Sequence, residues 1–185
     1  MTQPTAVAPA GNVIQAAAAA AHSIVQGDSL DESRHLVEHA KAVGEYLKAQ
    51  GLATSQIRNV FGTVRRIESN WRIPAGGKAH HADEAAHKAD EAARQDQEAE
   101  RTRLALRELT LLKPRLAYAA SRNPVVRHLA DVLTPAIDGV LDGIDFQSAE
   151  RDQWQGINKR ALQRFGRFLD FFEAILAYHR AAGGR

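Results

Sequence analysis

A short histidine–glutamate motif is the pattern in this sequence that most suggests catalysis. His35, Glu38 and His39 spell His-x-x-Glu-His, which occurs in one class of zinc peptidase. On a helix, His35 and His39 would share a face, as two ligands of one zinc ion must. No distal carboxylate motif accompanies them, and a match this short arises readily by chance in a chain with 8 histidines. We therefore favour an ordinary amphipathic helix here.

Other potential metal ligands are arranged even less convincingly. Glu32 with His35 and Glu84 with His87 have the Glu-x-x-His spacing of di-metal helical bundles. The second pair and the histidines at 80–81 lie in a polar segment with no apolar residues to enclose a site. Cys is absent, which excludes thiolate ligands, disulfides and cysteine nucleophiles. No glycine-rich phosphate loop or nucleophile elbow is present, so we predict no enzyme, no metal and no cofactor.

The charge is distributed unevenly along the chain, although the net charge is only +2. Residues 54–72 carry a local balance of +3, and residues 113–127 carry +4 without a single acid. Residues 80–100 carry seven acids against two bases, a balance of −5. A chain with this distribution can present a basic surface to nucleic acid although its total charge is close to zero.

The basic residues of the first segment have helical spacing. Arg58, Arg65 and Arg72 would lie along one side of a helix, with Gly62 between them, and Arg66 follows directly after Arg65. A small residue between arginines allows a phosphate backbone to approach closely, and each contact adds a salt-sensitive increment of affinity. Arginines that merely solvate a helix surface are the alternative.

The second basic segment contains Lys113, Arg115 and Arg122. The two arginines are one heptad apart, and Tyr118 lies one turn after the first of them. Tyr118 has two possible roles, packing in the protein interior or stacking on a base.

The chain is all-α by its periodicity, and we expect a compact bundle of five to seven helices with a long C-terminal helix. No segment alternates with period two. Helices are predicted at about 30–50, from Thr54 or Ser55 onward, and at about 147–179. Pro114 predicts a kink or a restart, and Asn123-Pro124 and Thr134-Pro135 each resemble a cap followed by proline at the first helical position.

The domain organisation follows from composition. For residues 1–27 we predict an Ala-rich, partly disordered arm that includes a helix-competent run. For residues 28–185 we predict a single helical domain. Two related heptads, at 81–87 and 88–94, lack large apolar residues, so we predict a charged, solvated helical insertion at about 75–100. No apolar run approaches the ~20 residues that cross a bilayer, and we expect a cytoplasmic protein.

Three segments together resemble a known family. TSQIRNVF at 54–61 with VRRIE at 64–68, LLKPRLAYAASR at 111–122, and FEAILAYHR at 172–180 are similar to the small subunit of type III-A CRISPR–Cas effector (Csm) complexes. They occur in the family's order over residues 35–72 and 104–185, whereas the arm and the heptads are not covered. Ser121 stands where glycine is expected.

The resemblance implies a non-catalytic, RNA-binding structural subunit. Copies would stack head to tail beside the guide-binding backbone subunits and the large subunit, in an inner filament that holds guide RNA and target RNA. Nuclease activity and cyclic-oligoadenylate synthesis would belong to other subunits. The RNA-contact residues would neutralise phosphates without reading sequence, since guide pairing supplies specificity; they are Arg58, Arg65, Arg66, Lys113, Arg115 and Arg122.

The alternative is a protein–protein helical adaptor that has no direct RNA contact. In that case the arginines would pair with neighbouring acids. The local charge balance does not decide between the two.

Overall fold

The computed structural model describes residues 10–72, 84–144 and 153–184, with side chains for 12–72, 91–144 and 153–184. Within these residues the chain forms six α-helices and no strand, which confirms the predicted all-α class. The helices are α1 (Ala10–Gln26), α2 (Leu30–Ala49), α3 (Thr54–Trp71), α4 (Glu84–Arg122), α5 (Pro124–Leu141) and α6 (Trp154–Ala181).

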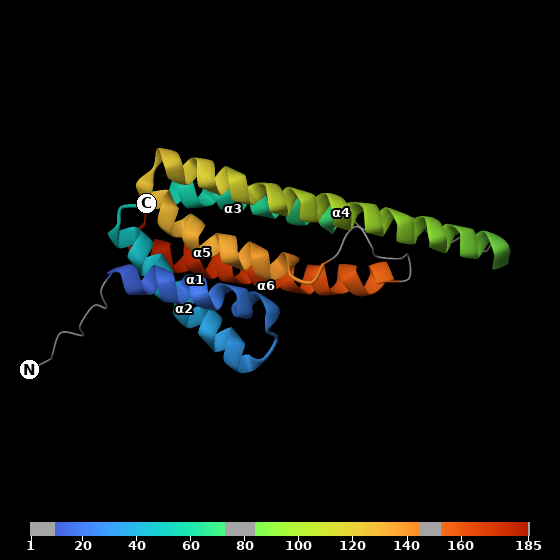
Figure 1. The fold of residues 1–185 in the computed structure, drawn as a ribbon, viewed down its shortest axis with the longest axis horizontal. Coiled ribbons are helices and arrows are strands. Elements are labelled where there is room, and N and C mark those ends of the chain that lie inside the picture. The colour runs from blue at the N-terminus through green and yellow to red at the C-terminus, as the bar shows by residue number, and fades with distance from the viewer. Residues whose placement is uncertain (1–9, 73–83, 145–152, 185) are drawn as a thin grey trace, which may run out of the picture.

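The long C-terminal helix α6 is the centre of the bundle, and it contacts each of the other five helices. Figure 1 shows α4 and α5 as an antiparallel hairpin above it, with α3 beside α4 and the α1–α2 pair on the opposite side. The C-terminus lies at the end of the bundle where α4 turns into α5. The N-terminal part of α4, at the opposite end of the bundle, extends past the end of α3.

Aromatic packing along α6 explains its central position. Phe165, Phe168 and Phe172 are fully buried, and each such side chain contributes about 1.5–3 kcal/mol through burial. Phe61 of α3 meets Phe172 edge-on with ring centroids 5.3 Å apart, and Trp71 lies 5.2 Å from Phe165. Both rings of α3 are thereby anchored on the central helix, which positions the whole of α3.

Local capping sets two of the helix starts. Ser29 accepts a hydrogen bond from the backbone N–H of Glu32, whose carboxylate accepts one from Ser29 N at 2.8 Å, a complete capping box. Asn123 caps α5 through the N–H of Val125, with Pro124 at the first helical position. The cap predicted at Asn123-Pro124 is therefore confirmed.

Of two other expectations about proline, the helix start at Thr134-Pro135 is wrong, and of the kink or restart at Pro114 only the restart is excluded. Pro135 lies inside α5, so Thr134-Pro135 does not begin a helix; the flanking Leu133 and Ala136 are fully buried and hold the segment in the core. Likewise α4 continues through Pro114 without a restart. Pro114 lacks the N–H that would bond the carbonyl of Thr110, and both residues are exposed.

Helix α1 packs into the bundle. Ala17, Ala21, Ile24 and Val25 are buried, and α1 lies against α5, α2 and α6. Within the predicted arm at 1–27, the described residues thus include part of the core, while residues 1–9 lie outside the described part. Of the predicted insertion, residues 84–100 are the beginning of α4, and no side chain from 91 to 100 is buried.

A buried histidine at the end of α6 positions the start of α3. His179 is completely buried, with Nε2 2.8 Å from the carbonyl of Leu52 and Nδ1 3.5 Å from the hydroxyl of Thr54. Leu52 lies in the connection between α2 and α3, and Thr54 is the first residue of α3. The ring therefore fixes where α3 begins, one turn before Arg58.

Candidate nucleic-acid interface

Three of the predicted RNA-contact residues lie on α3, and all three are exposed. Arg58, Arg65 and Arg66 stand away from the buried face that includes Ile57 and Val64. Because an α-helix has 3.6 residues per turn, Arg58 and Arg65 share one flank, whereas Arg66 lies about 100° further round. Arg66 thus points directly away from the core.

Glu68 neutralises part of the charge on α3. Its carboxylate lies 2.6 Å from Arg65 Nη1 and 3.3 Å from Arg72 Nη1, and its side chain is only 12% exposed. Arg58 and Arg66, in contrast, form no ion pair with any residue that the structure describes. Their full charge is therefore available to a partner, whereas that of Arg65 is shared with Glu68.

The basic residues of α4 divide between its two sides. Arg115 and Arg122 are exposed and, seven residues apart, lie on one flank. Lys113 lies about 160° from Arg115 around the helix, and its Nζ is 2.5 Å from Asp138 Oδ1 of α5. Lys113 therefore ties α4 to α5 and does not belong to the surface that carries the two arginines.

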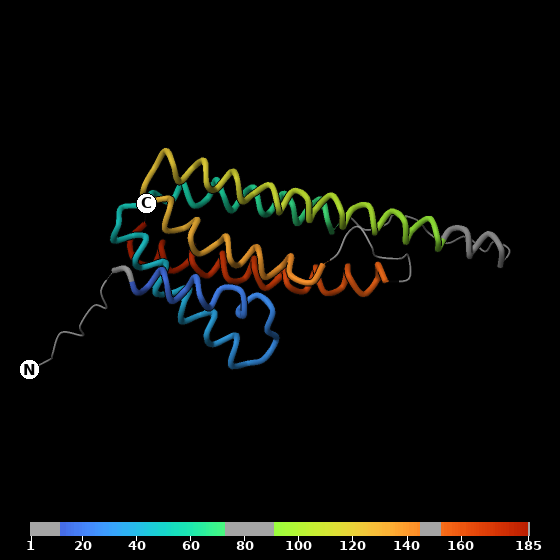
Figure 2. Tube along the Cα trace, in the orientation of Figure 1, coloured from blue at the N-terminus to red at the C-terminus, as the bar shows by residue number. Residues whose placement is uncertain are grey.

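A buried polar contact sets the register between α3 and α4. The indole N–H of Trp71 donates to Thr102 Oγ1 at 3.3 Å, and the two helices run antiparallel side by side (Figure 2). Arg58 precedes Trp71 by as many residues as Arg115 follows Thr102, and both helices rise 1.5 Å per residue. Arg58 and Arg115 consequently lie at the same level of the bundle.

The exposed arginines form a band rather than one cluster. The flank of α3 that carries Arg58 and Arg65 adjoins Phe61, which packs on α6, and Arg66 points outward from the crest of α3. Arg115 lies on the side of α4 away from α5. The basic band thus runs from one flank of α3 over its outer face to α4; it comprises Arg58, Arg65, Arg66, Arg115 and Arg122.

Arg107 belongs to the same surface, although it is absent from the predicted set. It is exposed on α4 at the level of Arg66, by the same register, and makes no ion pair with a described residue. Residues 100–108 hold three arginines and two glutamates, a local balance of only +1. The burial pattern of the helix, with Leu106 and Leu109 inward, identifies its exposed position.

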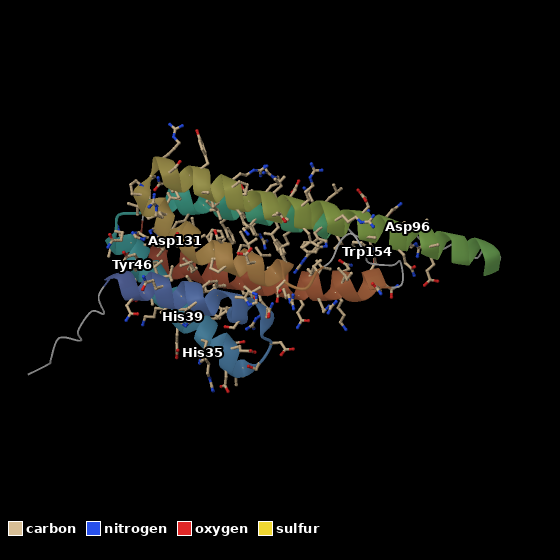
Figure 3. The ribbon with its side chains drawn as sticks, in the orientation of Figure 1. His35, His39, Tyr46, Asp96, Asp131 and Trp154 are labelled. Carbon is tan, nitrogen blue, oxygen red and sulfur yellow. The ribbon has the colours of Figure 1, made fainter. Side chains whose placement is uncertain are left out.

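The histidines of α2 do not form a metal site in the described part of the chain. No three His, Cys, Asp or Glu residues come together there in a way that would hold a metal ion. His35 is exposed and His39 is partly buried, both on α2 (Figure 3). Burial lowers the pKa of His39, and the neighbouring His35 lowers it further. The side chains of the second Glu-x-x-His pair, Glu84 and His87, lie outside the described residues.

Membrane insertion is not indicated by the described helices, since none of them combines the length and apolarity needed to cross a bilayer.

Comparison with known proteins identifies the family. The family model described as Csm2 Type III-A matches residues 31–185. This range includes the whole basic band and the described helices α2 to α6, apart from Leu30 at the start of α2. Searches of curated proteins and of solved structures give no match. The match runs through residues 81–100, beyond the two stretches that carried the resemblance. The chain therefore belongs to the Csm2 family, the small subunits of type III-A CRISPR effector complexes.

Proposed function

We propose that this protein is a non-catalytic structural subunit that binds the RNA of a type III-A interference complex. In this proposal, copies stack in the inner filament beside the guide-binding and large subunits in the cytoplasm. The basic band contacts the phosphate backbone of the guide–target duplex without reading its sequence. Three observations support the RNA contact: Arg58, Arg66 and Arg115 are exposed, form no ion pair with any described residue, and lie on two adjacent helices.

The level shared by Arg58 and Arg115 is the observation that carries the proposal. Guanidinium groups at one level on neighbouring helices form a row across the bundle, which suits a nucleic-acid backbone that crosses α3 and α4. Arg66 and Arg107 repeat the arrangement further along the same two helices. We expect less from Arg65, which Glu68 neutralises, and least from Lys113, which Asp138 engages.

Charge removal tests this function in the reconstituted complex. The variant combines Arg58→Ala, Arg115→Ala and Arg122→Ala, and affinity for target RNA is measured at several salt concentrations. Each lost phosphate contact makes the dependence of log affinity on log salt shallower by about 0.7–0.9, so the loss of three contacts should make the slope shallower by about 2–3. Circular dichroism checks that helicity is unchanged.

A control variant removes the same three charges elsewhere. Arg34 and Lys41 on α2 and Arg160 on α6 are exposed and lie outside the basic band. Their combined replacement by alanine should leave the salt dependence of RNA affinity unchanged. Equal salt slopes for both triple variants and the wild type would remove the basis for the RNA-contact assignment.

A protein–protein adaptor is the second candidate, and one observation favours it. Leu104 and Leu111, seven residues apart on α4, are 51% and 42% exposed, an apolar strip suited to a protein partner. If the chain is only an adaptor, Leu104→Ala with Leu111→Ala should release it from the complex, while the triple arginine variant leaves RNA affinity unchanged.

A further inference from the structure

Tyr118 is an exposed aromatic side chain on the outer face of α4. It is 64% exposed, whereas Leu112 and Leu116 on the inner face are almost completely buried. Of its two possible roles, packing in the protein interior is therefore excluded. A large ring held in water loses the free energy that burial would provide, so this position is suited to a partner that covers the ring.

The side chain of Arg122 holds the ring in place. Arg122 Nη1 donates a hydrogen bond of 3.0 Å to the phenolic oxygen, and the guanidinium carbon lies 5.9 Å from the ring centroid. These contacts restrict the two torsions of Tyr118 before any partner binds, which lowers the entropic cost of binding. They also place a positive charge at the edge of an aromatic surface, the combination on which single-stranded nucleic acids bind.

The segment of α4 that carries Tyr118 borders a groove. The neighbouring groove between α4 and α5 has a volume of about 560 Å³ and is lined in part by Ala117, Ala120, Ser121 and Ala130. Ser121 Oγ donates a 2.7 Å hydrogen bond to the carbonyl of Tyr118, so the serine folds back onto its own helix.

We propose that Tyr118 is a stacking platform for the base of an unpaired nucleotide. The inference rests on the proposed RNA contact and deepens it, since it adds a nucleobase to the phosphates. Inside a duplex a base is stacked on both faces, so only an unpaired or terminal base can lie on the tyrosine ring. Every base has a π-face, so the contact is tolerant of sequence. Arg122 then engages the phosphate next to that base.

Ring removal tests the stacking. The assembled complex, carrying Tyr118→Leu or Tyr118→Phe, is titrated with a fluorescently labelled single-stranded RNA complementary to the guide except for unpaired flanking nucleotides. Tyr118→Leu keeps an apolar side chain but loses the ring, and affinity should fall by about 5-fold to 150-fold. Its salt slope should match the wild type, because no charge is lost. Tyr118→Phe should retain most of the affinity. Val37→Ala, which truncates an exposed apolar side chain on α2 outside the basic band, is the control and should bind as the wild type does.

The outcomes separate this inference from the proposed function. Wild-type affinity for Tyr118→Leu, together with weakened binding by the triple arginine variant, would overturn the stacking and leave the phosphate contact standing. Weakened binding by Tyr118→Leu with an unaffected arginine variant would support stacking and contradict the phosphate assignment. Loss of the subunit from the complex carrying Tyr118→Leu, seen in the stoichiometry by native mass spectrometry, would show that Tyr118 binds protein and would also overturn the inference.

Discussion

Replacing Gly44 with alanine should destabilise the protein, although alanine is the better helix former. Gly44 is buried in α2 where this helix crosses α6. A Cβ atom there would lie 2.7 Å from the carbonyl oxygen of Ile175 and 2.8 Å from the backbone nitrogen of His179. Both are backbone atoms, which cannot rotate out of the way as a side chain can. The two helices must therefore move apart.

The magnitude follows from two opposing effects. Overpacking of a tight core costs typically about 1–3 kcal/mol, and we expect the upper end because backbone meets backbone. The gain in helix propensity from Gly to Ala is about 1 kcal/mol. The free energy of unfolding should thus fall by about 2 kcal/mol, which lowers the melting temperature by about 4–8 °C for a chain of this size.

Gly62→Ala is the matched comparison on α3, because a Cβ at Gly62 would meet nothing within 4 Å. Only the propensity gain remains, so the melting temperature should rise by about 2–4 °C. Differential scanning calorimetry measures both variants. An equal rise for Gly44→Ala and Gly62→Ala would refute the close α2–α6 crossing, and with it the position of His179 and of the start of α3.

Gly62→Ala also bears on function, since Gly62 lies between Arg58 and Arg65. If a phosphate approaches the helix backbone there, the added methyl group should weaken RNA binding a few-fold while the protein becomes more stable. Gly166→Ala on α6 is the control: this position is equally open and lies outside the basic band. It should stabilise the protein without changing RNA affinity.

Three further changes have defined outcomes. Folding lowers the pKa of His39, so below about pH 6.5 the unfolded chain binds a proton at this residue more readily than the folded protein does. The free energy of unfolding of the wild type should therefore fall between pH 7.5 and pH 5 relative to that of His39→Gln. Urea unfolding at both pH values measures this difference. Ser29→Ala removes the N-cap hydrogen bond to Glu32 and should cost about 1 kcal/mol, or about 2–4 °C in melting temperature. Thr102→Val deletes the buried hydroxyl that accepts from Trp71 and should lower the free energy of unfolding by about 1 kcal/mol in the same urea assay.

The helix faces were predictable because they depend on local periodicity. Ile57, Val64, Ile67 and Trp71 recur at helical spacing, and all four are buried. The buried face of α6 is wider than a single amphipathic stripe, since Phe171 is fully buried as well as Phe165, Phe168 and Phe172. A helix that contacts five others is buried around most of its circumference, whereas a single amphipathic stripe predicts burial on one side only.

The role of α1 could not be read from its residues alone. A run of alanines forms a helix in many contexts, and little apolar area distinguishes a packed run from a solvated one. The decisive feature lies far away in the sequence: a Cβ at Gly139 of α5 would approach the carbonyl oxygen of His22 to 2.9 Å. Small residues on α1 and Gly139 on α5 together let the two backbones come close. Whether residues 1–27 and 28–185 behave as separate units stays a prediction.

The candidate site was predictable only where its contacts are local in the sequence. The i,i+3 pairing of Arg65 with Glu68 is visible in the sequence. The pairing of Lys113 with Asp138 is not, because it joins two helices across a turn. The common level of Arg58 and Arg115 depends on the contact between Trp71 and Thr102, which no local pattern specifies.

RNA crosslinking in the purified complex tests the central claim most directly. Target RNA that carries photoreactive 4-thiouridine is bound to the complex and irradiated, and crosslinked peptides of this subunit are mapped by mass spectrometry. We predict crosslinks in the segments of α3 and α4 that carry Arg58, Arg66, Arg115 and Arg122. Crosslinks confined to other subunits, or to other helices of this chain, would contradict the proposed RNA interface and favour the adaptor.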